Sequence, residues 1–151
     1  MKINDPSNEV LLELSLAKKE DMMITFEWAS NPYLRKYSPN NNSIPFQTHQ
    51  NWFLKKLQDP ACRFYIVKVD GKPAGTCRLD FVNSNAIAEI SYLLDPEYHG
   101  KGLGLKTIEE LVKKAKLELS SITQILGLLD FLFARRLFVE LVERTLIQYR
   151  Q

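Results

Sequence analysis

The 151-residue sequence contains few residues of the kinds that bind metals or form disulfides. Its two cysteines and two histidines show neither the spacing of a metal site nor a disulfide framework. We therefore expect no metal. A hairpin around Asp70-Gly71 would bring Cys62 and Cys77 towards each other, but we interpret both as small buried thiols without a chemical role.

Strong net charge and long apolar runs are also missing. The formal charge is +2, and no stripe of Lys and Arg with interleaved aromatics is present, which argues against a nucleic-acid partner. The N-terminus lacks a signal-peptide pattern, and no apolar stretch approaches the roughly 18 residues of a membrane span. We expect a cytoplasmic protein without a membrane partner, whose residues 1–151 form a single domain.

Hydrophobic periodicity divides the chain into strands and helices. Strands are predicted at 9–17, 63–69, 73–81 and 87–94, with the middle two joined as a hairpin by Asp70-Gly71. Helices are predicted at 18–30, from an N-cap at Thr48 to Asp59-Pro60, and at 104–119, where Leu105 is one of the expected core residues; 33–46 is predicted to be a loop.

Beyond these elements, the prediction is a buried parallel strand at 124–129, a helix at 131–142 and a closing strand at 145–149. This order indicates an α+β fold with one mixed, mostly antiparallel sheet flanked by helices.

A glycine-rich loop, residues 98–104, lies between a predicted strand and a predicted helix. Backbone N–H groups at a helix N-terminus can converge on an anion, and glycines let it approach closely. The spacing fits neither the dinucleotide fingerprint nor a P-loop. A flexible connection is the alternative interpretation.

The segment from Glu89 to Gly104 resembles the acetyl-CoA segment of the GNAT superfamily of N-acetyltransferases, and the resemblance spans roughly residues 9–130. The loop in that family usually reads Arg or Gln, two variable residues, Gly, one variable residue, then Gly or Ala. Gly102 and Gly104 occupy the glycine positions, and His99 stands where Arg or Gln is usual. The resemblance implies a GNAT-like domain with acetyl-CoA as co-substrate. The cofactor-binding residues it implies are Tyr92, Leu93, Leu94, His99, Gly100, Lys101, Gly102, Leu103 and Gly104.

Two residues are candidates for proton transfer. Glu89 lies on the strand that leads to the loop, where members of the family often carry a general base, although a solvated strand carboxylate is an equal alternative. His49 is a second candidate base or substrate contact, set against a packed or surface histidine. Residues 130–141 lack the family's Tyr and Asn, with Phe138 near the Tyr position, so a pseudo-enzyme that only binds acyl-CoA is a further alternative.

The N-terminal half carries a second pattern, in residues 26–32, 35–38, 49–53, 59–60 and 64–66. This pattern resembles acetyltransferases that modify a nucleotide-linked 4-amino sugar on the pathway to pseudaminic acid, and similar Trp and Asn-Pro features occur in ribosomal-protein N-terminal acetyltransferases. The resemblance implies a small-molecule amine as partner, with Tyr37, Asn40 and His49 contacting it; a homodimer is left open. A lysine amine, with a pKa of about 10.4, must lose its proton at a cost of roughly 4 kcal/mol near neutral pH. This cost favours an amino sugar or a protein N-terminus as acceptor.

Overall fold

The computed structural model describes residues 9–36, 38, 42–82 and 87–126, and the side chains within this part except those of 82, 87 and 118–126. The strands are β1 (Leu12–Leu16), β2 (Cys62–Val69), β3 (Lys72–Val82) and β4 (Ile87–Leu94). The α-helices are α1 (Met22–Ser30), α2 (Pro32–Arg35), α3 (Phe46–Gln58) and α4 (Leu103–Leu126), with short 3-10 turns η2 (Lys19–Asp21) and η3 (Pro96–Tyr98).

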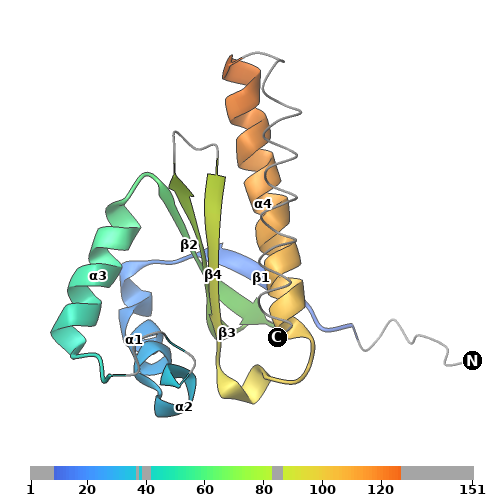
Figure 1. Cartoon of the computed structure of the whole chain (residues 1–151). Helices are drawn as coiled ribbons and strands as arrows, with labels where there is room; N and C mark the ends of the chain where they lie inside the picture. The colour runs from blue at the N-terminus through green and yellow to red at the C-terminus, as the bar shows by residue number, and fades with distance from the viewer. Residues whose placement is uncertain (1–8, 37, 39–41, 83–86, 127–151) are drawn as a thin grey trace, which may run out of the picture.

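The four described strands form one sheet in the order β1-β2-β3-β4, and each neighbouring pair is antiparallel. The predicted hairpin is confirmed. Asp70 and Gly71 have φ angles of 49° and 79°, and a two-residue turn with two positive φ angles matches the right-handed twist of the strands that it joins. β4 continues the meander beside β3, which brings the end of β4 to the loop before α4 (Figure 1).

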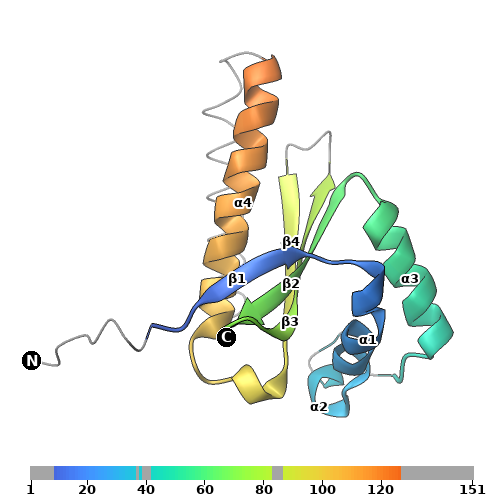
Figure 2. The same ribbon diagram turned by 180° about the vertical axis from the view of Figure 1, so that it is seen from behind.

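Helices cover the sheet on both faces. α4 crosses one face, while α1, α2 and α3 gather on the other side, as the two opposite views show (Figures 1 and 2). Period-2 alternation divides β3 and β4 between these sides. Cys77, Leu79 and Ala88 pack in the α4 core with Leu111, and they are almost completely buried. Arg78, Asp80 and Ser91 are therefore on the face towards α1 and α3, where the polar chemistry lies.

Three predicted helix details were wrong. α3 begins at Phe46 after Pro45 in the N-cap position, two residues before Thr48. The expected loop contains the short helix α2, because the Asn31 side chain accepts a hydrogen bond from Tyr33 N–H at 2.9 Å and Pro32 suits the first helical position. Leu105 is half exposed, and the core position at the start of α4 is filled by Leu103.

The predicted strand at 124–129 is contradicted over 124–126, where α4 continues. Ala115, Leu119, Ile122 and Leu126 keep a helical spacing, and neither Gly nor Pro interrupts it. Residues 127–129 and the elements predicted at 131–142 and 145–149 lie outside the described residues. In the described part, no helix is both long and apolar enough to cross a membrane.

Candidate active site

The glycine-rich loop borders a cavity of about 470 Å³ between the end of β4, η3 and the start of α4. We call it the loop cavity; its lining includes Tyr92, Leu93, Leu94, His99, Gly102 and Gly104. Gly100 and Gly102 both have a φ of 73°, and nothing lies within 4 Å of the place where a Cβ would stand on either. The loop therefore presents bare backbone to open space.

The first turn of α4 supplies hydrogen-bond donors to this cavity. Lys106 N–H donates to the Gly102 carbonyl at 3.3 Å, so the N–H groups before it precede the helical bonding pattern. Leu103 and Gly104, in this first turn, both line the cavity. A helix start of this kind favours a phosphate through its N–H groups and the helix dipole.

Two contacts join β4 to the loop. A Cβ on Gly104 would lie 3.2 Å from the Tyr92 hydroxyl oxygen, so this glycine lets α4 approach the Tyr92 ring closely. His99 Nε2 lies 2.9 Å from the Leu94 carbonyl, and because a carbonyl only accepts, Nε2 is the donor. This hydrogen bond from His99 connects the loop to the end of β4.

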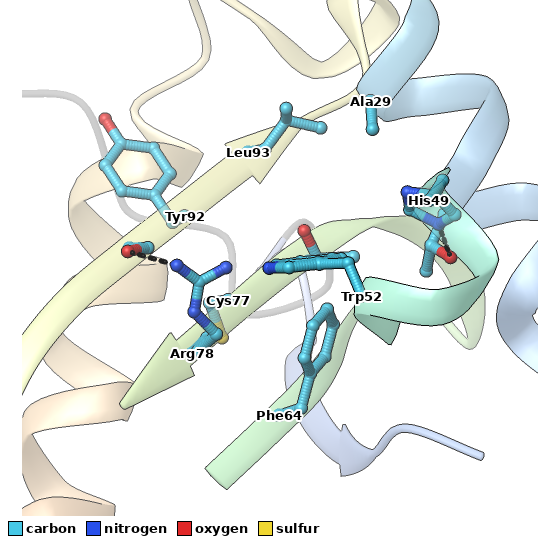
Figure 3. Close-up of a pocket in the computed structure, with 11 residues that line it drawn as sticks. Ala29, His49, Trp52, Phe64, Cys77, Arg78, Tyr92 and Leu93 are labelled. Carbon is cyan, nitrogen blue, oxygen red and sulfur yellow. Dashed lines mark hydrogen bonds between the residues drawn. The ribbon is translucent and has the colours of Figure 1, made fainter. Parts of the chain in front are cut away.

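A second cavity, of about 190 Å³, lies between the sheet and helices α1 and α3 (Figure 3). We call it the Trp52 cavity; Thr25, His49, Trp52 and Arg78 are among its lining residues. Tyr92 and Leu93 line both cavities. The two cavities therefore meet along the last part of β4.

Arg78 is the charged residue of the Trp52 cavity. Its Nε donates to Asp80 Oδ2 at 2.6 Å. Its Nη2 donates to Ser91 Oγ at 3.2 Å, and the guanidinium lies 5.2 Å from the centre of the Trp52 ring (Figure 3). Lys56 Nζ donates to the other Asp80 oxygen at 2.7 Å. Burial alone would raise the pKa of Asp80, but the bonds from Lys56 and Arg78 outweigh it and lower that pKa.

His49 is buried in the wall of the Trp52 cavity, with 3% of its surface exposed. Its Nε2 lies 3.1 Å from Thr25 Oγ1, and Phe53 stacks on the ring with an interplanar angle of 17°. Burial lowers the pKa of His49 below its ordinary 6.5.

Comparison with known proteins decides the family. The model of the acetyltransferase (GNAT) family matches residues 22–140. This chain belongs to the GNAT family. It is accordingly an N-acetyltransferase that acts on amines and uses acetyl-CoA as its co-substrate, and the bare glycine backbone and helix start of the loop cavity fit the pyrophosphate of that molecule.

Solved structures share the GNAT fold. Aminoglycoside acetyltransferase AAC(6')-Ib in complex with coenzyme A is 19% identical, with a TM-score of 0.61 over 70% of this chain and 67% of that one. Spermidine N-acetyltransferase from Vibrio cholerae, in complex with CoA and spermine, is 22% identical, with a TM-score of 0.61 over 72% and 66%. An acetyltransferase from Thermus thermophilus is 15% identical, with a TM-score of 0.59 over 68% of each chain. No curated protein sequence matches the chain significantly.

The described structure brings most of the predicted GNAT site residues together. All of the predicted cofactor residues except Lys101 line the loop cavity; Lys101 is exposed, with its Nζ 5.7 Å from the centre of the Tyr98 ring. Glu89 is exposed opposite Asp80 in the sheet and lines neither cavity, and its catalytic role stays a prediction. Tyr37 and Asn40 lie outside the described residues.

Sequence reasoning missed Arg78 and Thr25. Arg78 and Asp80 alternate with apolar residues along β3, a pattern that marks one polar face of a half-buried strand. That pattern could have singled them out, whereas nothing local in the sequence pairs Thr25 with His49, 24 residues away. Cys62 and Cys77 are free and buried, and burial raises the pKa of their thiols to about 11 and about 12.

Proposed function

We propose that this acetyltransferase acetylates the 4-amino group of a nucleotide-linked amino sugar, which it holds in the Trp52 cavity. One observation carries the proposal: among the described residues that line this cavity, Arg78 is the one charged side chain and none is a carboxylate. The acceptor's surroundings are therefore suited to neutral or anionic groups beside the amine.

Charge separates this acceptor from a polycation. Arg78 and Lys56 share the single carboxylate of Asp80, so these three groups sum to one positive charge. A polyamine or a multiply charged aminoglycoside would meet a like charge there, whereas a sugar carries hydroxyls that accept hydrogen bonds and its diphosphate carries negative charge.

A third cavity supports a diphosphate. It has a volume of about 300 Å³ and includes Arg35 and Lys36 in its lining, together with Ser30. Ser30 follows Ala29, a lining residue of the Trp52 cavity, on α1. Guanidinium and ammonium groups at such a place favour phosphates.

The donor side follows from the loop cavity. We infer that the N–H groups at the start of α4, with Gly100 and Gly102, hold the pyrophosphate, and that main-chain groups of Tyr92 to Leu94 hold the pantetheine arm. Acetyl-CoA, when bound, supplies an acetyl group activated as a thioester. Because Tyr92 and Leu93 line both cavities, this arrangement would bring that thioester to the acceptor amine.

The second candidate function is acetylation of a protein N-terminus. The feature that favours it is that similar Trp and Asn-Pro features occur in the ribosomal-protein N-terminal acetyltransferases. An α-amine with a pKa near 8 is as easily deprotonated as a sugar amine, so amine pKa does not separate the two acceptors.

The test is kcat/KM for a UDP-linked 4-amino sugar against an N-terminal peptide, at one saturating acetyl-CoA concentration. We expect the sugar to be preferred by at least about tenfold, which corresponds to about 1.4 kcal/mol. A tenfold preference for the peptide would overturn the amino-sugar proposal and favour the second candidate. Acetyl-CoA binding without turnover of any amine would instead indicate a protein that only binds acyl-CoA.

A further inference from the structure

This inference rests on the proposed function: an acceptor amine that reacts in the Trp52 cavity needs a group there that can take up its proton. His49 is the one described lining residue whose side chain ordinarily titrates near neutral pH. The Cys77 thiol, with its pKa raised to about 12 by burial, stays protonated, and the Arg78 guanidinium has hydrogen-bond donors but no acceptor. Among the described residues that line the cavity, His49 is therefore the candidate proton acceptor.

Hydrogen bonding fixes which nitrogen of His49 carries the hydrogen. Thr25 Oγ1 lies 2.9 Å from the Met22 carbonyl, and its single hydrogen is donated there. Thr25 Oγ1 must therefore accept from His49 Nε2, which lies 3.1 Å away. In the neutral ring, Nε2 then bears the hydrogen and Nδ1 carries the free lone pair.

The Nδ1 atom is open to the surroundings. It has no hydrogen-bond partner among the described residues, yet no fully buried side-chain nitrogen or oxygen of the described part lacks a partner. Nδ1 must therefore reach accessible space, and the Trp52 cavity is the described space that His49 lines.

Packing holds the ring in this orientation and keeps it neutral. Phe53 stacks on it with ring centres 5.8 Å apart, while the Phe26 and Trp52 rings lie 5.5 and 5.6 Å away. Arg78 is the charged group that β3 presents to this cavity; β4 presents Ser91 and Leu93, and Glu27 on α1 is exposed. Burial in this apolar setting lowers the pKa of His49, so the ring is neutral at pH 7 and ready to accept a proton.

We propose that His49 is the general base of the transfer, with Nδ1 as the accepting atom. The acceptor nitrogen forms the amide bond to the acetyl carbon while the carbon–sulfur bond breaks, and the nitrogen must lose one proton. His49 Nδ1 takes that proton, and the imidazolium returns it to the departing CoA sulfur. The transfer then consumes and releases no net proton. Thr25 acts through His49 as a positioning residue.

The decisive variant is His49→Gln, compared with Glu89→Gln. A Gln amide can still donate to Thr25 Oγ1, but it has no basic atom in place of Nδ1. The rates are measured from pH 5 to 9 with whichever amine the wild type acetylates fastest among a UDP-linked 4-amino sugar, an N-terminal peptide and spermidine. The result then does not depend on the proposed acceptor. Calorimetry with acetyl-CoA verifies that each variant is folded.

We expect His49→Gln to lower kcat/KM about 10²-fold, a typical general-base contribution. As the pH is lowered below 6.5, log kcat/KM should fall more steeply in the wild type and in Glu89→Gln, because His49 becomes protonated and can no longer act as a base. In His49→Gln this steepening should be absent. Protonation of the amine itself affects all variants alike. The proposal is overturned if His49→Gln keeps the steepening or if Glu89→Gln loses it.

Thr25→Val gives an independent test should His49→Gln fail to fold. It keeps the ring and the side-chain volume but removes the oxygen that accepts from Nε2, and this oxygen favours the imidazolium. The steepening should therefore move to lower pH in Thr25→Val. An unmoved profile would overturn the proposal.

Discussion

Gly102 and Gly71 are matched residues in different settings. Both have positive φ angles, 73° and 79°, and both have open space where a Cβ would stand, but Gly102 lines the loop cavity and Gly71 turns the hairpin. Glu at either position costs about 1–2 kcal/mol of backbone strain. Only Gly102→Glu adds a negative charge where the pyrophosphate is expected.

Calorimetry on the two variants should show acetyl-CoA affinity weakened about tenfold or more in Gly102→Glu and close to wild type in Gly71→Glu. Equal acetyl-CoA affinities in the two folded variants would contradict the assignment of the pyrophosphate site to this loop.

Gly75 is required for the close approach of β3 to β4. A Cβ there would overlap the Leu93 carbonyl oxygen and lie 2.8 Å from Leu94 Cα, both of which are backbone atoms that cannot move alone. We expect Gly75→Ala to lower the free energy of unfolding by about 3 kcal/mol, as overpacking does. Urea unfolding measures this loss. The control is Gly71→Ala, in which the added Cβ causes backbone strain but no clash. A smaller loss in Gly75→Ala than in Gly71→Ala would contradict this description of the strand pair.

At the scale of residues, the sequence predicted that Gly102 and Gly104 lie between a strand and a helix, because glycine spacing and periodicity are local signals. Their role in binding the cofactor stays a prediction. The environment of His49 was not predictable, because its partner Thr25 and the rings of Phe26 and Trp52 come together only through tertiary packing. A single sequence does not indicate which residues come together in space.

Asp95 connects three elements at the point where β4 ends. Its Oδ1 accepts from Glu97 N–H at 2.9 Å, which caps η3, and its Oδ2 accepts from Trp28 Nε1 on α1 at 3.0 Å. Asp95→Ala would remove a cap worth about 1 kcal/mol and leave the N–H of the buried Trp28 unpaired at a cost of about 1–3 kcal/mol. We expect a combined loss of about 3 kcal/mol in urea unfolding.

Asp95→Asn is the matched control, because its amide oxygen can still accept one of the two bonds. It should lose less stability than Asp95→Ala. Equal unfolding midpoints for wild type and Asp95→Ala would show that this connection contributes nothing.

At the level of elements, alternation and turn chemistry predicted the hairpin and β4, since both are local. The helix boundaries were less accurate. Pro45 serves as the N-cap of α3 without a side-chain bond, so the better capping residue Thr48 misled the prediction. The apolar run at 124–129 suits a buried strand and a helix equally well, and its first three residues continue α4.

At the scale of the whole molecule, two cavities meet at the end of β4. The loop cavity is bordered by bare glycine backbone, and the Trp52 cavity is lined mainly by side chains. Tyr92 and Leu93 line both cavities, so in the proposed arrangement the acetyl donor and the acceptor amine would meet along these residues. In the Trp52 cavity, Arg78 donates to Asp80 and Ser91 and lies 5.2 Å from the centre of the Trp52 ring, and its charge is the basis of the proposed preference for a neutral or anionic acceptor.

That preference is measured most directly by kcat/KM for a UDP-linked 4-amino sugar relative to spermidine, in the wild type, Arg78→Gln and Arg78→Lys. We predict that the wild type favours the sugar at least about tenfold, that Arg78→Gln reduces this ratio about tenfold because the positive charge is lost, and that Arg78→Lys lies between them. A wild type that favours spermidine, or a ratio that is the same in all three proteins, would contradict the account.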